Sequence, residues 1–340
     1  MNLVKQVKIA TISFASMAFA STSIAETVLK FHSGLAQSRQ EAHHIEEFAK
    51  LVNEKSDGDI RIDVYHAGSL GLKEADMLRI MQAGLVDMAL MYGEYYKRDA
   101  PALASVYAQG AITEADQHLE LLPTLRSIYK DAYANWGIHT IGGVVAPVYD
   151  VGLHCKAPVN TLADLKDKKV RVWSGHLVDT FKKLGITAQV IGQNDMYLAL
   201  QTGVVDCAYY LSTVAKTVSL QEVTDYEAYL HPWAASPWMF GVSDKTWKSL
   251  SESQQAILAE AGEEIWQETK LLAVDPEREK AAREERKGLG ITVLEPFSQE
   301  DVNTFVEAAM DAWKEMATAS GEEGLQYYNT VSELAKKQQQ

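Results

Sequence analysis

The alternation of hydrophobic and polar residues follows the same order of periods in two halves of the chain. In the first half, residues 28–34 and 59–68 alternate as in a β-strand, and residues 40–56 between them have a helical period. The same order of strand, helix and strand returns between residues 169 and 192. Each half therefore predicts a β-α-β unit.

A second helix and strand follow in each half, and here the letters themselves repeat. MLRIMQAGLVDMAL (77–90) and MYLALQTGVVDCAY (196–209) are identical at six of 14 positions. In each copy a glycine, Gly84 or Gly203, stops a helical period and a short apolar run follows, which predicts helix, turn and buried strand. Two such halves predict an α/β fold of two lobes, each a doubly wound, mostly parallel sheet, with a cleft at the carboxyl ends of the strands.

Two apolar segments are placed to connect the lobes. Residues 139–156 are expected to pass from the first lobe to the second, and residues 235–243 to pass back. Residues 251–274 have a helical period, and Pro276 is expected to kink or end this long helix. The predicted lobes are discontinuous: 26–147 plus 236–275, and 148–235 plus 276–340, whose C-terminal part can pack back on the first lobe.

The N-terminus is typical of a cleavable secretory signal. Lys5 and Lys8 precede the apolar run IATISFASMAFA, and small residues follow, which predicts a signal peptide of residues 1–25 cut after Ala25. No cysteine lies at the cut, so we expect no lipid anchor and a periplasmic location. The formal net charge of the 340 residues is −14, and removing the two lysines makes it −16. This balance argues against nucleic acid or an anionic membrane as partner, although a local positive centre can still bind a small anion.

The two cysteines, Cys155 and Cys207, favour buried free thiols, with a disulfide as the alternative in an oxidising compartment. The chain contains no G-x-S-x-G, H-E-x-x-H, Walker or G-x-G-x-x-G motif, so we expect no enzyme and no cofactor. His43 and Glu47 have the i, i+4 spacing of a metal pair, but two exposed polar groups on a helix are the simpler interpretation. We expect no metal.

Several segments together resemble one protein family, the extracytoplasmic solute-binding proteins of tripartite ATP-independent periplasmic (TRAP) transporters, or DctP family. The resemblance runs from about Val28 to Met316, and its segments are ADMLRIMQAGLVDMAL, TLADLKDKKVRV, FKKLGITAQVI, MYLALQTGVVD and SDKTWKSLSESQQ. It implies a type II-like two-lobed binding protein with a long helix spanning both lobes. It also implies capture of an organic acid by closure and delivery to the small and large integral-membrane permease subunits. A binding protein of an ATP-driven importer is the alternative of the same fold.

Arg171 is the expected ligand anchor. Strand alternation in KKVRVW places it inside a parallel sheet, where a charge needs a partner, and its planar guanidinium matches a carboxylate. The alternative is a structural ion pair, for example with Asp206. The resemblance implies the ligand role, because the family has at this position an arginine that binds the ligand carboxylate.

The sequence departs from the family pattern at three places. Tyr210 stands where an asparagine usually binds the carboxylate, and Trp233 where relatives often have His or Asn. Asp150 lies near the place of a second arginine in sugar-acid binders, so it is expected to repel a second carboxylate.

These departures predict a less polar pocket than one for sialic acid or C4-dicarboxylates. Glu74 is a further candidate, although an acid in the first turn of a helix also explains it. Each aromatic residue alone fits the core as well as a ligand wall. The expected ligand is a monocarboxylate, possibly aromatic, and the alternative is a zwitterion with a carboxylate or sulfonate on Arg171 and an onium group over a ring. The candidate ligand-binding residues are Arg171, Trp173, Tyr210, Trp233, Tyr92, His32, Glu74 and Trp238.

Overall fold

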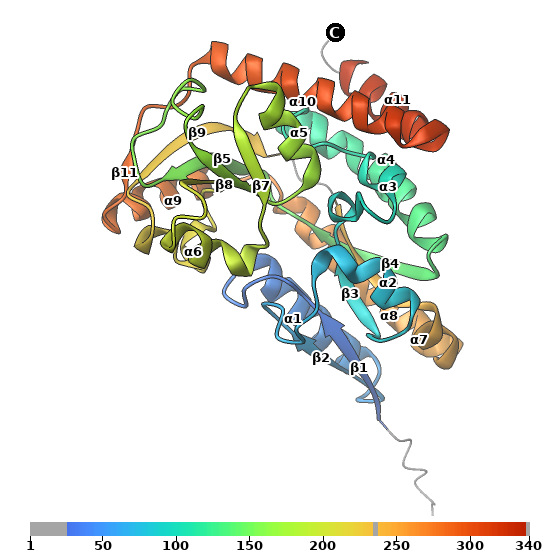
Figure 1. The fold of residues 1–340 in the computed structure, drawn as a ribbon. Helices are drawn as coiled ribbons and strands as arrows, with labels where there is room; N and C mark the ends of the chain where they lie inside the picture. The colour runs from blue at the N-terminus through green and yellow to red at the C-terminus, as the bar shows by residue number, and fades with distance from the viewer. Residues whose placement is uncertain (1–25, 234–236, 338–340) are drawn as a thin grey trace, which may run out of the picture.

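The computed structural model describes residues 26–233 and 237–337, which form two lobes, each with one β-sheet covered by helices (Figure 1). The first sheet has the order β2 (Ile60–Tyr65), β1 (Thr27–His32), β3 (Met88–Met91), β10 (Pro237–Ser243), β4 (Ile138–Val145). The second has the order β11 (Thr292–Val293), β9 (Tyr226–Trp233), β5 (Tyr149–Cys155), β8 (Cys207–Leu211), β6 (Lys169–Val172), β7 (Thr187–Val190). Among the described residues, no helix has the length and apolarity needed to cross a membrane.

The two predicted β-α-β-α-β units are confirmed. In the first lobe, β2, β1 and β3 are parallel, and in the second β7, β6 and β8 are parallel in the equivalent order. The connecting helices are α1 (Gln40–Lys55) and α2 (Met77–Gln82) in the first unit, and α5 (Gly175–Lys183) and α6 (Gln193–Gln201) in the second.

The repeated glycines end their helices in the same way. Gly84 and Gly203 have φ angles of 61° and 75°, in the left-handed region that favours glycine. After them, the Leu85 N–H donates to the Ile80 carbonyl and the Val204 N–H to the Ala199 carbonyl, the hydrogen bond of a Schellman motif. The repeated letters therefore encode one turn, used once in each lobe.

The repeated aspartates also have equivalent roles. Asp87 Oδ2 accepts a hydrogen bond from the Lys30 N–H, and Asp206 Oδ2 accepts one from the Lys169 N–H, both at 2.9 Å. Each aspartate thus fixes β1 or β6, the central strand of the three-stranded parallel unit in its own lobe. Among the described residues, Asp206 is not an ion-pair partner of Arg171.

Strand register corrects how the two halves match. Phe31 lies opposite Met88, and Val170 lies opposite Cys207, the residue equivalent to Met88 in the repeat, so Phe31 and Val170 occupy equivalent positions. The strands VLKFHSG (28–34) and KVRVWSG (169–175) both end in Ser-Gly, but an alignment on these two letters is shifted by two residues from the structural one. In the structure, His32 occupies the position equivalent to Arg171.

The sheets are mixed rather than mostly parallel. The chain leaves the first sheet in β4 and enters the second in β5, and it returns from β9 to β10. Strands β5 and β10 are antiparallel to both of their neighbours, because each chain segment enters the sheet from the other lobe. The letters predicted the crossing segments, but sequence patterns do not show strand direction.

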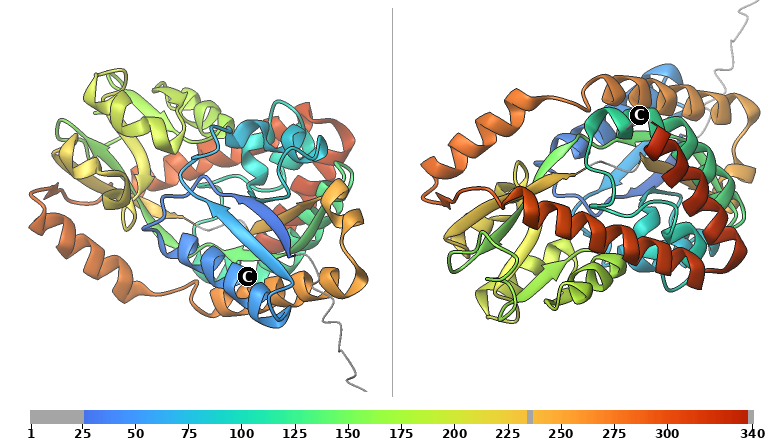
Figure 2. Two further views of the ribbon diagram at one scale, coloured as in Figure 1. Left: turned by 90° about the horizontal axis from the view of Figure 1, so that it is seen from below. Right: turned by 90° about the horizontal axis from the view of Figure 1, so that it is seen from above.

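The long helix after β10 is two helices. The first, α8 (Glu252–Leu271), contacts β4 and α1, and the second, α9 (Pro276–Gly288), contacts β11 of the second sheet. Pro276 begins α9 instead of ending α8, because proline suits the first helical turn and Asp275 caps it by accepting from the N–H groups of Glu277 and Arg278. Figure 2 shows α9 continuing from α8 towards the second lobe.

The remaining helices cover the outer faces. Helix α10 packs on α5 of the second lobe and α11 packs on α4 of the first, so the C-terminal segment contacts both lobes (Figure 2). The bounds are α3 (Pro101–Ala104), α4 (Ala115–Ala134), α7 (Asp244–Ser249), α10 (Gln299–Ala319) and α11 (Gly321–Lys337). Short 3-10 turns are η1 (Glu74–Asp76), η2 (Gly93–Tyr96), η3 (Ala215–Val218) and η4 (Leu220–Glu222).

Cys155 and Cys207 form a disulfide, so the expectation of two free thiols is wrong. The two residues lie directly opposite each other on β5 and β8, and both are buried. Their separation of 52 residues in the chain gave no sign of this, because the pairing depends on the register of two antiparallel strands.

Candidate functional site

A cavity of about 920 Å³ lies between the lobes, at the carboxyl ends of the central strands. The segments that follow β1, β3, β6, β7 and β8 reach it, as the fold predicts for a ligand site in α/β sheets. Six of the eight candidate residues line it: Tyr92, Trp238, Glu74, Arg171, Trp173 and Tyr210. Residues that no pattern had singled out also line it, among them Leu35, Arg39, Tyr95 and Gln193.

Arg171 is a buried cation at this cavity, with 1% of its surface exposed. Its Nε donates to the Ile191 carbonyl at 2.9 Å, whereas its Nη1 has no hydrogen-bond partner. Among the described residues, no carboxylate lies within ion-pair distance of it. Burial lowers the pKa of Arg171, and the nearby Tyr210 and Tyr95 raise it by less. A buried, unpaired guanidinium is costly, and an anionic ligand removes that cost.

A second buried arginine, Arg39, has its own carboxylate. Arg39 Nη2 lies 2.5 Å from Glu41 Oε1, Arg39 Nε lies 3.1 Å from Glu41 Oε2, and Tyr149 donates its hydroxyl to Oε1 at 2.7 Å. Burial raises the pKa of Glu41, but the charge and hydrogen bonds of Arg39 outweigh it and hold that pKa below its ordinary value. The pair is therefore ionised, and it adds no net charge to the cavity.

Sequence reasoning missed Arg39. It lies in a loop just before α1, and its two hydrogen-bond partners are Glu41, in the first turn of the helix, and Gln193, in the other lobe. The only local signal was the spacing of Arg39 and Glu41, which is common on protein surfaces.

The two lobes meet beside the cavity. Arg39 of the first lobe donates to Gln193 Oε1 of the second at 3.1 Å, and Tyr210 donates its hydroxyl to the same oxygen at 2.9 Å. Elsewhere, the Gln109 N–H donates to His176 Nε2 at 2.9 Å, so this nitrogen must be unprotonated. Burial lowers the pKa of His176 to about 4, which keeps that acceptor available at neutral pH.

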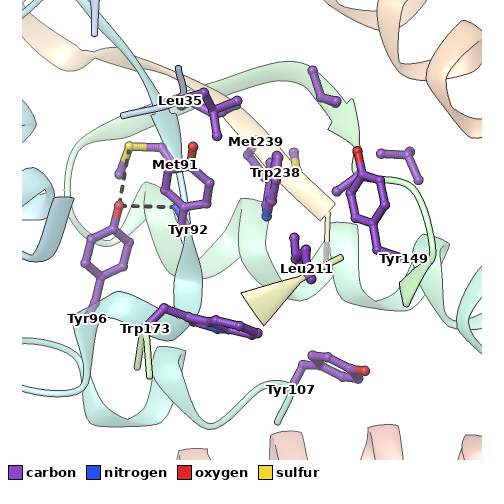
Figure 3. Packing of buried hydrophobic residues seen from close by; sticks show 14 of the residues in the cluster. Leu35, Met91, Tyr92, Tyr96, Tyr107, Tyr149, Trp173, Leu211, Trp238 and Met239 are labelled. Atoms are coloured by element: carbon purple, nitrogen blue, oxygen red, sulfur yellow. Dashed lines mark hydrogen bonds between the residues drawn. The ribbon is translucent and has the colours of Figure 1, made fainter. Parts of the chain in front are cut away.

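Aromatic rings form the wall of the cavity on the first lobe. The rings of Tyr92 and Trp238 lie side by side with centroids 5.1 Å apart, and Tyr95 lies 5.2 Å from Tyr92. Trp173, from the second lobe, lies below them (Figure 3). Tyr92, Trp238 and Trp173 also belong to the hydrophobic core, so each contributes both to the core and to the cavity wall.

His32 and Glu74 act as one unit. His32 is fully buried and does not line the cavity, but its Nε2 lies 2.8 Å from Glu74 Oε1. Glu74 begins η1 and lines the cavity, with its Oε2 buried and without a hydrogen-bond partner. A Cβ on Gly34 would lie 2.3 Å from Glu74 Oε1, so a larger residue there would force the Glu74 carboxylate to move. His32 was expected to contact the ligand, but it reaches the cavity only through its contact with Glu74.

Two further expectations change. Asp150 forms an ion pair with Arg283 and does not line the cavity, so it does not repel a second carboxylate there. Trp233 lies in β9, paired with Tyr149, and its side chain is outside the described part of the structure.

The metal pair suggested by spacing also changes. His44, not His43, faces Glu47, at 2.9 Å, and Glu268 from α8 lies close to both. These three residues could hold a metal ion, but both glutamates are exposed, and such groups are common without an ion.

Comparison with known proteins identifies the family. The model of "Bacterial extracellular solute-binding protein, family 7", DctP, matches residues 31–320. The chain belongs to this family. It is a TRAP periplasmic solute-binding protein, a class without enzymatic activity, and the alternative of an ATP-driven importer's binding protein is wrong. The family implies membrane permease partners.

Three relatives illustrate the range of the family. The monocarboxylate 2-oxoacid-binding periplasmic protein of Nostoc sp. (strain PCC 7120) is 28% identical over 80% of this chain and 74% of its own. A TRAP protein of Sulfitobacter sp. NAS-14.1, with bound β-D-galacturonate, has a TM-score of 0.75, 24% identity and coverage of 91% and 98%. A marine metagenome TRAP protein specific for aromatic acid ligands, in complex with metahydroxyphenylacetate, has a TM-score of 0.75, 20% identity and coverage of 92% and 99%. The ligand named for each of these three proteins is an organic acid.

Proposed function

We propose that this protein captures an organic monocarboxylate, with an aromatic or other apolar body, in the cavity between its lobes and delivers it to a TRAP permease. The observation that carries the proposal is Arg171, a fully buried guanidinium at the cavity with a free Nη1 and no carboxylate partner among the described residues. An entering carboxylate supplies the missing charge and accepts its hydrogen bonds.

The balance of charge favours a ligand with one negative group. Of the two buried arginines at the cavity, Arg39 is neutralised by Glu41, and Arg171 is left for the ligand. The other cations of the lining are at least partly exposed: Lys97 and Arg98 are paired with aspartates, and Lys73 is exposed. Glu74 lies on the opposite lobe and repels a second carboxylate. A dicarboxylate would therefore leave one charge buried without a partner, which is costly.

The walls favour an apolar or aromatic body. Tyr92, Trp238 and Trp173 offer ring faces and edges on which another ring can pack. The family includes a protein specific for aromatic acids and one for 2-oxoacids, and both bind monocarboxylates. Proteins for sugar acids also occur in the family, so the walls and the charge balance, not the family, support this choice.

A zwitterion is the second candidate, and Glu74 favours it. Its unpartnered Oε2 is buried, and the cavity that Glu74 lines also has the rings of Tyr92 and Trp238, an environment that suits an onium group. In this case the acid group of the zwitterion would still bind Arg171.

A ligand panel tests the proposal. Residues 26–340 are unfolded and refolded to remove any carried ligand, then titrated calorimetrically with 3-hydroxyphenylacetate, phenylpyruvate, 2-oxobutanoate, succinate, galacturonate and glycine betaine. We expect binding of the monocarboxylates, and we expect Arg171→Met to weaken it by at least 100-fold, because charged hydrogen bonds contribute about 1.5–3 kcal/mol each. Arg61→Met, at a half-exposed arginine of β2, is the control and should bind normally.

Three outcomes contradict the proposal. Binding that survives Arg171→Met would remove Arg171 as anchor. Preference for succinate or galacturonate would refute the single-charge argument. Preference for glycine betaine would favour the zwitterion, and Glu74→Gln should then weaken its binding.

A further inference from the structure

Gln193 is a side chain of the cavity whose orientation is fixed from one side. Its Oε1 accepts hydrogen bonds from Arg39 Nη1 at 3.1 Å and from the Tyr210 hydroxyl at 2.9 Å. A guanidinium can only donate, so the atom facing Arg39 must be the oxygen and not the amide nitrogen. The amide therefore cannot rotate without losing both hydrogen bonds.

This orientation leaves the Nε2 of Gln193 as a donor without a partner. The atom is buried, and no described residue accepts a hydrogen bond from it. Leaving a buried amide N–H unsatisfied is costly, so an acceptor at this point contributes binding energy in addition to its own hydrogen bond.

The unpartnered amide and the unpartnered guanidinium both line the cavity and are connected through Tyr210. Arg171 is held by the carbonyl of Ile191, two residues before Gln193 in the same loop, and both side chains line the cavity. The ring of Tyr210 connects them, because its hydroxyl binds Gln193 and its centroid lies 5.4 Å from the Arg171 guanidinium carbon. Two unpartnered donors that both contact Tyr210 suit a ligand group with two acceptor atoms.

We propose that Gln193 donates its amide N–H to the anionic group of the ligand beside Arg171 and so determines specificity for a carboxylate. Arg39 and Tyr210 are positioning residues, since they hold the amide oxygen and aim the nitrogen at the ligand. This inference rests on the proposed function, because it concerns the same cavity and the same ligand group.

Gln193→Glu is the sharpest test. One carboxylate oxygen can still accept from Arg39 and Tyr210, so the positioning network is kept, while the donor at the cavity becomes a negative acceptor. The probes are 3-hydroxyphenylacetate and its primary amide, 3-hydroxyphenylacetamide. We expect Gln193→Glu to weaken the acid by on the order of 100-fold, the size of one hydrogen bond to a charged group lost. The neutral amide probe should bind as well as before or better, because its NH₂ can donate to the new carboxylate.

Two matched variants complete the experiment. Gln201→Glu makes the same change at an exposed position of the same helix and should leave both probes unaffected. Tyr210→Phe removes one of the two hydrogen bonds that orient the amide, and we expect it to weaken the acid by about tenfold. Thermal melting of each variant checks that it is folded.

The outcomes separate this inference from the proposed function. If Arg171→Met abolishes binding of 3-hydroxyphenylacetate but Gln193→Glu leaves the affinities of both probes unchanged, Gln193 has no role and the proposed function stands. If Gln193→Glu weakens acid and amide equally, the effect is structural and the inference is wrong. If the wild type does not bind 3-hydroxyphenylacetate at all, both the aromatic monocarboxylate and this inference fail.

Discussion

The buried pair of Arg39 and Glu41 allows a quantitative test of the charge balance in the cavity. The two side chains are 2% and 1% exposed, and Glu41 receives three hydrogen bonds, two from Arg39 and one from Tyr149. Glu41→Gln keeps the shape but removes the negative charge, so Arg39 remains buried without an ionic partner. Removing one member of a buried ion pair costs about 3–5 kcal/mol. We expect a loss near 3 kcal/mol, because the glutamine oxygen still accepts one hydrogen bond.

The assay is urea unfolding of residues 26–340 without ligand, read by circular dichroism. Glu54→Gln is the control, since Glu54 is on the same helix in an exposed pair with Lys50 and should cost at most about 1 kcal/mol. The double variant Arg39→Met with Glu41→Leu should cost less than the two single variants together, because no charge is left buried. In the folded Glu41→Gln protein, succinate should bind more tightly than to the wild type. A loss equal to that of Glu54→Gln, with unchanged succinate affinity, would refute the reasoning.

Two further results are expected. Asp206→Ala removes the acceptor of one strand N–H and should lower the free energy of unfolding by about 1 kcal/mol in urea titrations. Asp87→Ala should lower it by more, because Asp87 also accepts a hydrogen bond from Thr246. Burial lowers the pKa of His118 to about 3 and that of His176 to about 4, below the ordinary 6.5. Below pH 6.5 the unfolded chain therefore binds more protons than the folded protein. The free energy of unfolding should fall by about 3 kcal/mol for each histidine as the pH decreases from 6.5 towards 4. His118→Leu should reduce the slope of unfolding free energy against pH, and an unchanged slope would contradict this assignment.

Local patterns predicted the parts of the fold that depend on neighbours in the chain. The turn at Gly84 and Gly203 requires a left-handed residue and a following apolar strand, and both requirements are visible in the letters. The parts that depend on distant segments were not visible. The antiparallel direction of β10, the pairing of Cys155 with Cys207 and the two-residue shift of β1 against β6 follow from how strands of different chain segments pair.

The candidate site shows the same division. Arg171 was predicted because a charge within a strand pattern is unusual and because the family has an arginine there. Tyr210 was predicted to take the place of an amide at the ligand, whereas its hydroxyl donates to Gln193 and its ring lies against Arg171. Arg39 and Gln193 are polar residues in loop or helix-start positions, and only the closeness of two lobes makes them part of a site.

The two lobes share a frame and differ in chemistry at one equivalent position. In each lobe an aspartate fixes the central strand, β1 or β6, and the same glycine turn leads into the neighbouring strand, β3 or β8. At the carboxyl end of the central strand, the first lobe has His32, joined to the acceptor Glu74, and the second has Arg171, a donor without an acid. A ligand with a carboxylate at one end and a hydrogen-bond donor at the other therefore satisfies both lobes only when they enclose it. We expect such a ligand to stabilise the closed arrangement, because its contacts with both lobes exist only when the lobes are closed. A carboxylate that contacts only Arg171 makes no such contacts and would not favour closure.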